Sequence, residues 1–193
     1  MIRKFLFLMI ALVLFTNATL INRVTKTKET VTLPVFVDYN IPYLQRNFVA
    51  FKEALAFKES QGKYTVVNTL GYLGKYQFGK TTLQRFKIYD TKAFLKNPEL
   101  QEKAFIALCS VNKWILRRDI KNSIGKTING IKITESGILA AAHLSGAGNV
   151  KKFLRSNGAV RFSDAYGATI QSYMKRFSDY DVSNVIADRK AKV

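Results

Sequence analysis

The stretch that most constrains the fold runs from Pro98 to about Asp119. Its apolar residues recur at helical spacing and cover more than one face, which is typical of a helix buried among other elements. Proline is favoured in the first turn of a helix, so Pro98 marks the start. The sequence therefore predicts a long central helix with the rest of the domain packed around it. The apolar positions are Leu100, Ala104, Ile106, Leu108, Val111, Trp114, Ile115 and Leu116.

Shorter helices are predicted on both sides of this one, and strand signals are few. Thr134 is a suitable helix cap, and Gly146 and Gly148 are suitable helix stops. The expected fold class is mainly α with few short strands. We expect a domain over 43–178 and a polar C-terminal tail over 179–193. The shorter helices are predicted at 44–59, 77–88, 137–144, 149–156 and 169–178, with a β-prone loop at 122–133.

The first residues predict a secretory signal. Arg3 and Lys4 give a positive start, and residues 5–15 form a continuous apolar run of signal-peptide length. The run is shorter than the roughly 20 apolar residues of a transmembrane helix. We expect a signal peptide over 1–18, with an uncleaved anchor as the alternative, and an extended linker over 19–42. The protein is therefore predicted to be exported to the periplasm, the cell envelope or the medium.

Charge and cysteine content limit the partners and the chemistry. The chain has 31 basic and 13 acidic residues and a formal net charge of +18, which favours encounter with anionic envelope polymers, anionic lipid and nucleic acid alike. The basic residues are scattered along the chain, so nucleic acid is not the expected partner. Cys109 lies in an apolar run and is predicted to be a buried, inert thiol. One histidine and one cysteine offer no metal-ligand spacing, so no metal site is expected.

Glu59 closes the predicted helix 44–59, just before a segment rich in glycine and aromatic residues. Apolar residues such as Phe51 and Leu55 give this helix an apolar face. A carboxyl group beside such a face is poorly solvated, which favours its protonated form. A protonated carboxyl group near neutral pH is what a general acid needs to protonate a glycosidic oxygen. A glutamate at a helix end can also be an ordinary solvated carboxylate, so the interpretation depends on the segments that follow.

Three motifs follow one another in the chain. They are Glu59-Ser60 at a helix end, the glycine-bearing segment from Gly71 to Gln77, and the small-residue turn from Ala141 to Gly148. Together they resemble the lysozyme-like lytic transglycosylases, the enzymes that cut the glycan strands of peptidoglycan. The resemblance covers about 47–177 and implies a lysozyme-like fold. It implies that Glu59 is the catalytic acid and that the substrate is contacted by Ser60, Tyr76, Gln77, His143, Gly146 and the late aromatic Tyr173.

The resemblance also implies a reaction that needs no cofactor. The partner would be a peptidoglycan glycan strand, cut at the β-1,4 bond between N-acetylmuramic acid and N-acetylglucosamine. Glu59 would protonate the glycosidic oxygen and then take the proton of the muramyl C6 hydroxyl. That hydroxyl would close onto C1 and give a 1,6-anhydromuramic end.

Three alternatives stay open at the level of sequence. They are a muramidase of the same fold, a non-catalytic glycan-binding protein of the envelope, and a basic protein active on nucleic acid or membranes. A two-carboxylate glycosidase needs a second acidic residue across the scissile bond. The possible partners lie in no motif-like setting, which favours a single-acid mechanism; they are Asp90, Asp119, Glu135 and Asp164. His143 is interpreted either as a core histidine or as a second group that handles protons.

Overall fold

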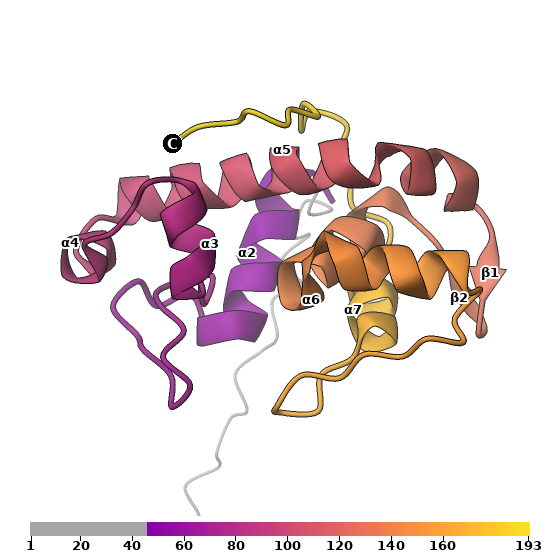
Figure 1. Cartoon of the computed structure of the whole chain (residues 1–193), viewed down its shortest axis with the longest axis horizontal. Coiled ribbons are helices and arrows are strands. Elements are labelled where there is room, and N and C mark those ends of the chain that lie inside the picture. Colours follow the sequence, from indigo (N-terminus) through magenta and orange to yellow (C-terminus); the bar gives the residue numbers. More distant parts are fainter. Residues whose placement is uncertain (1–45) are drawn as a thin grey trace, which may run out of the picture. The chain divides into compact units, whose positions relative to one another are not determined.

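The computed structural model describes residues 46–193. The signal peptide predicted over 1–18 and the linker predicted over 19–42 lie outside these residues. The described part is mainly helical, as predicted, with a small two-stranded sheet (Figure 1). No helix within 46–193 combines the length and the apolar character needed to cross a bilayer. The elements are α2 (Phe48–Ser60), α3 (Lys80–Arg85), α4 (Thr91–Leu95), α5 (Pro98–Ser123), β1 (Thr127–Ile128), β2 (Ile131–Lys132), α6 (Glu135–Arg155) and α7 (Ile170–Arg176).

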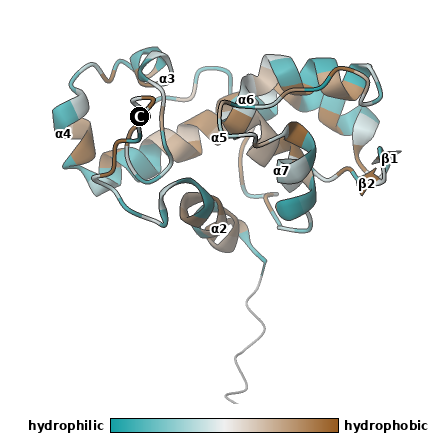
Figure 2. Cartoon of the chain, turned by 90° about the horizontal axis from the view of Figure 1, so that it is seen from below, coloured by the Kyte–Doolittle hydropathy of each residue, from teal (hydrophilic) through white to brown (hydrophobic). Residues whose placement is uncertain are grey.

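Helix α5 is the long central helix that the sequence predicts. Asn97 caps it by accepting a hydrogen bond from the N–H of Leu100, and Pro98 occupies the first turn. In Figure 1, α5 has α2, α3 and α6 on one side and the C-terminal segment on the other. Hydrophobic stretches accordingly recur along its length (brown in Figure 2), although Ile106 is exposed, contrary to the pattern. Cys109 is buried as predicted, and burial raises the pKa of its thiol to about 12.

Aromatic side chains form the core between α2 and α5. Phe51 of α2 and Phe105 of α5 are fully buried, and their ring centroids lie 6.4 Å apart. Tyr76, from the segment between α2 and α3, stacks on Phe105 with a centroid distance of 4.1 Å. Aromatic pairs of this kind contribute beyond the area that they bury. The ring cluster therefore holds the segment after α2 against both helices.

Helix α6 begins at the predicted cap, where the Thr134 hydroxyl accepts a hydrogen bond from the N–H of Gly137 at 3.1 Å. A β-carbon on Gly137 would lie only 2.8 Å from the carbonyl oxygen of Met174, so glycine allows α6 and α7 to approach. Gly146, with φ 76° and ψ 152°, breaks the helical geometry inside α6. The predicted interruption between two helical stretches is thus confirmed.

The ends of two predicted helices are wrong for local reasons. Helix α2 begins only at Phe48 because the Asn47 side chain caps it, accepting a hydrogen bond from the N–H of Ala50. The helix predicted from 77 begins only at Lys80, because Gln77 has a φ of 50° and belongs to a turn.

The prediction of a polar tail over 179–193 is also wrong. Val182 and Val185 are buried in the main core, and the N–H of Asp188 donates a hydrogen bond to the carbonyl of Ser110 on α5. The Arg189 guanidinium lies 5.1 Å from the centre of the Trp114 ring. Polar residues dominate this stretch, but two valines are enough to anchor it. The domain therefore extends beyond 178 along α5.

Candidate active site

Glu59 is the second-last residue of α2 and lies at the edge of a groove. The helix ends there because Gln61 adopts a left-handed conformation with φ 58°, and its N–H caps the last turn. Gly62 follows with a φ of 78°, a conformation that glycine adopts at little cost. The chain thus turns away directly after Glu59 and leaves its half-buried side chain facing the groove.

Ser60 holds the segment from Gly71 to Gly79, which we call the glycine segment. Its buried hydroxyl donates a hydrogen bond to the carbonyl of Lys75 at 2.8 Å and accepts one from the N–H of Lys63 at 3.0 Å. It lines none of the hollows around Glu59. Ser60 therefore links α2 to the glycine segment, in place of the contact with substrate that was expected of it.

Within the glycine segment, neighbouring residues point in opposite directions. Tyr76 is fully buried and its hydroxyl donates a hydrogen bond to Glu102 at 2.9 Å, so the predicted contact of Tyr76 with substrate is wrong. Phe78 is also buried. Gln77 lies between them, lines the groove, and donates a hydrogen bond from Nε2 to the carbonyl of Gly74 at 2.9 Å. A β-carbon on Gly74 would clash with Gln101 at 2.2 Å, which explains the glycine there.

A cluster of charged side chains fixes the glycine segment from behind. The Lys75 ammonium donates hydrogen bonds to Glu53 and Glu102, each at 2.8 Å, and its side chain is 5% exposed. Glu102 also accepts hydrogen bonds from Lys52, Tyr64 and Tyr76. A buried ammonium is stable only when it is paired in this way. The cluster therefore ties the backbone beside Gln77 to α2 and α5.

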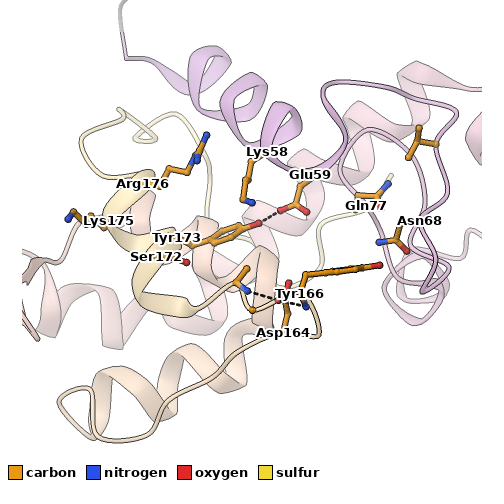
Figure 3. A pocket seen from close by; sticks show the side chains of 13 residues that line it. Lys58, Glu59, Asn68, Gln77, Asp164, Tyr166, Ser172, Tyr173, Lys175 and Arg176 are labelled. Carbon is orange, nitrogen blue, oxygen red and sulfur yellow. Dashed lines mark hydrogen bonds between the residues drawn. The ribbon is translucent and has the colours of Figure 1, made fainter.

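Three adjoining hollows form the groove. Glu59 and Gln77 line both the largest hollow, of about 910 Å³, and a smaller one of about 340 Å³. Gln77 and His143 line both the smaller hollow and a third of about 630 Å³. The hollows are thus neighbours that share wall residues, and Glu59 belongs to the wall that the first two share. Figure 3 shows the lining of the largest hollow, with the Glu59 carboxylate facing Tyr173.

Tyr173 of α7 contacts Glu59 directly. Its hydroxyl donates a hydrogen bond to Glu59 Oε1 at 2.6 Å, while its ring is almost completely buried. Burial raises the pKa of the Tyr173 hydroxyl, and the charge of Glu59 raises it further, so the hydroxyl remains a proton donor. The Tyr173 hydroxyl therefore orients the Glu59 carboxyl group, and because Tyr173 also lines the largest hollow, its contact with substrate stays a prediction.

His143 and Gly146 also line the groove, His143 in the 340 Å³ hollow that Glu59 lines and Gly146 outside it. His143 Nε2 lies 2.8 Å from the carbonyl oxygen of Tyr76, and the ring packs edge-on against Phe78 with centroids 5.9 Å apart. Nδ1 is buried without a hydrogen-bond partner among the described residues. Gly146, at the break in α6, lines the 630 Å³ hollow. His143 thus supports the glycine segment and forms part of the wall.

The sequence did not predict that two loops lie beside Glu59, although it offered Asp164, in one of them, as a possible second carboxylate. Asn68 and Asp164 each line the 910 Å³ and 340 Å³ hollows, as does the exposed Tyr166. Asparagine and aspartate shortly before Gly71 and Gly167 are typical of tight turns. That signal predicts the loops, but nothing local in the sequence shows that they meet at Glu59.

The groove combines an oriented carboxyl group with amides and hydroxyls, which suits acid–base chemistry on a polar ligand. Within 46–193, no three side chains of histidine, cysteine, aspartate or glutamate gather closely enough to hold a metal ion. No protein-family model matches the chain, and neither the curated proteins nor the solved structures contain a significant match to it.

Proposed function

We propose that this protein is a peptidoglycan-cleaving enzyme with a lysozyme-like fold that acts as a lytic transglycosylase. The observation that carries the proposal is the position of Glu59. It lies at the end of a helix, in the lining of two hollows of the groove, and its carboxyl group is oriented by the Tyr173 hydroxyl at 2.6 Å. A positioned carboxyl group of this kind is what glycosidic bond cleavage requires.

The lining of the groove supports a sugar polymer as the ligand. Asn68 and Gln77 offer amide groups, and Tyr72 offers a hydroxyl, for hydrogen bonds to sugar hydroxyl and acetamido groups. Lys58 and Arg176 line the largest hollow and suit a glycan that carries anionic peptides. Such strands lie in the cell envelope, where an exported protein would meet them.

In the proposed reaction, Glu59 gives its proton to the glycosidic oxygen as the bond from that oxygen to C1 of the muramyl residue breaks. The C6 hydroxyl of the same residue then attacks C1, and the Glu59 carboxylate accepts its proton. The products are a free hydroxyl on N-acetylglucosamine and a 1,6-anhydromuramic end. Glu59 is protonated again, so neither water nor a cofactor is consumed.

Tyr173→Phe tests the positioning of Glu59. The phenyl ring keeps the packing of α7, but the hydrogen bond to the carboxyl group is lost. We expect cleavage of purified sacculi to slow by about tenfold or more, because misplaced catalytic groups lose effective molarity. Thermal unfolding should change little. Tyr180→Phe, at a half-buried tyrosine that packs against Phe51 and lines none of the hollows, is the matched control, and equal activity of the two variants would contradict this role.

One observation favours a second candidate function, a muramidase that hydrolyses the same bond. Asp164 lines both hollows that Glu59 lines, so a second carboxylate is present in the groove. Its Oδ1 accepts hydrogen bonds from the N–H groups of Tyr166 and Ala168, at 3.0 and 2.7 Å. These two hydrogen bonds within the loop explain why residue 164 is an aspartate without giving it a catalytic role, which favours the transglycosylase.

Asp164→Asn separates the two functions. The asparagine oxygen can accept the same two hydrogen bonds, so the loop is kept while the carboxylate is lost. Mass spectrometry of products from purified sacculi should show 1,6-anhydromuramic ends with both the wild type and the variant. Reducing ends from the wild type, lost in the variant, would instead show a hydrolase. Glycan binding without any cleavage would show a non-catalytic binding protein.

A further inference from the structure

Two tight loops, 68–72 and 164–168, face each other beside Glu59. In the first, the Asn68 side chain accepts hydrogen bonds from the N–H groups two and four residues further on, at 2.9 and 3.0 Å. In the second, the Asp164 side chain does the same at 3.0 and 2.7 Å. Local hydrogen bonds of this kind fix a loop without help from a helix or sheet. Each loop therefore keeps its shape as a unit.

The tips of the two loops are joined by a hydrogen bond. Thr69 Oγ1 and Tyr166 Oη lie 2.6 Å apart, although 97 positions separate the two residues in the chain. Both residues are exposed. Figure 3 shows Tyr166 reaching from the loop of Asp164 toward the segment that carries Asn68. The side chain thus crosses from one wall of the groove to the other.

This contact lies at the point of the groove where Glu59 is found. Tyr166 and Asn68 line both the 910 Å³ and the 340 Å³ hollow, as Glu59 does. One end of the contact, Tyr166, therefore belongs to the lining of both hollows, while Thr69 adjoins Asn68 just outside that lining. A polymer that occupies both hollows passes Tyr166, the end of the contact that lines them.

We propose that Thr69 and Tyr166 form an openable strap across the groove, which decides whether a glycan strand enters by its end or is laid in from the side. The proposal rests on the glycan cleavage inferred above. The end of a strand can thread past a closed strap, whereas an internal stretch requires the hydrogen bond to break. Water competes for an exposed hydrogen bond, so the closed state is favoured by no more than about tenfold.

Removing either hydroxyl tests the strap. Tyr166→Phe keeps a ring that can stack on a sugar, and Thr69→Val keeps the shape of the threonine. We expect each variant to raise cleavage within long strands of intact sacculi by about threefold, relative to release of end fragments, because the open state becomes the major one. For Thr69→Val, whose side chain lines none of the three hollows, rates on short soluble oligosaccharides should stay at the wild-type level. Tyr89→Phe, at an exposed tyrosine outside the groove, is the matched control.

Locking the strap gives the opposite result. A protein with Thr69→Cys and Tyr166→Cys is joined by a short bismaleimide, and the same protein capped with N-ethylmaleimide is the control. Cys109 is buried and should not react. We expect the rate at which the joined protein cleaves within long strands to fall by at least about tenfold. It should cleave short oligosaccharides within about twofold of the capped control.

Several outcomes would overturn the strap. The first is that the joined and capped proteins cleave equally well within long strands. The second is that joining abolishes cleavage of short oligosaccharides. The third is that Tyr166→Phe behaves like the wild type while Tyr166→Ala is impaired. If the wild type binds glycan without cleaving it, the proposed reaction fails but the strap does not. Joining should then slow association with long strands alone. Absence of glycan binding by every variant would overturn both proposals.

Discussion

We expect Glu59→Gln to abolish the cleavage of purified sacculi while the protein stays folded and still binds glycan. Glutamine has nearly the volume of glutamate and can still accept the hydrogen bond from Tyr173, so the groove is preserved. It has no proton to give to a leaving oxygen. Positioned acid–base groups contribute on the order of 10²–10⁴ in rate, and here one group serves both steps. We therefore expect a loss at or beyond the upper end of that range.

The assay measures release of soluble muropeptides from sacculi, together with a pull-down of the protein by the same sacculi. Glu99→Gln is the matched control, because Glu99 is exposed at the start of α5 in a surface ion pair with Lys103. That variant should cleave like the wild type. Cleavage by Glu59→Gln at the wild-type rate would remove Glu59 as the acid, and with it the proposed function. Loss of both cleavage and binding, with the fold intact, would instead assign Glu59 to ligand binding.

Much of the fold follows from local patterns in the sequence. The Pro98 start of α5, the Thr134 cap of α6 and the break at Gly146 each depend on the residues in and next to one element. The packed C-terminal segment could not be predicted in this way. Val182 and Val185 form no periodic pattern, and they become core residues only because α5 offers a surface to them.

The candidate site was predictable only in part, for the same reason. The resemblance pointed to Glu59, Gln77 and Tyr173, which the structure brings to one groove, yet it did not indicate that the Tyr173 hydroxyl holds Glu59. Tyr76 belongs to the core because the turn at Gln77 directs neighbouring side chains to opposite sides. The approach of Tyr166 to Glu59 depends on how α6 and α7 pack, and no spacing in the sequence encodes it.

The second large effect concerns the charged cluster behind the glycine segment. We expect Glu102→Gln to lower the free energy of unfolding by about 3 kcal/mol at pH 7, the lower end of the range for breaking a buried ion pair. The side chain of Lys75 is only 5% exposed and would lose one of its two carboxylate partners. Lys52 would lose the Glu102 carboxylate as well. The lower end of that range applies because Lys75 keeps Glu53 as its second carboxylate partner.

The pH dependence gives this prediction a distinctive signature. Burial by itself would raise the pKa of Glu102, but hydrogen bonds from Lys52, Lys75, Tyr64 and Tyr76 lower it from 4.5 to about 2. A carboxyl group whose pKa is lower in the folded state stabilises the protein above its unfolded pKa. That contribution should disappear as the pH falls from about 4.5 toward 2. The difference between Glu102→Gln and the wild type should therefore shrink over this interval.

Urea unfolding at a series of pH values from 7 downward measures this difference. Glu99→Gln again serves as the control, since its fully exposed ion pair with Lys103 should contribute little to stability. A loss for Glu102→Gln no larger than that of the control, or one that persists unchanged at low pH, would show that the cluster does not stabilise the fold. If the loss is as expected, Gln77 should also be held less firmly. Cleavage by Glu102→Gln should then decline at a lower temperature than in the wild type, although Glu102 lines none of the groove.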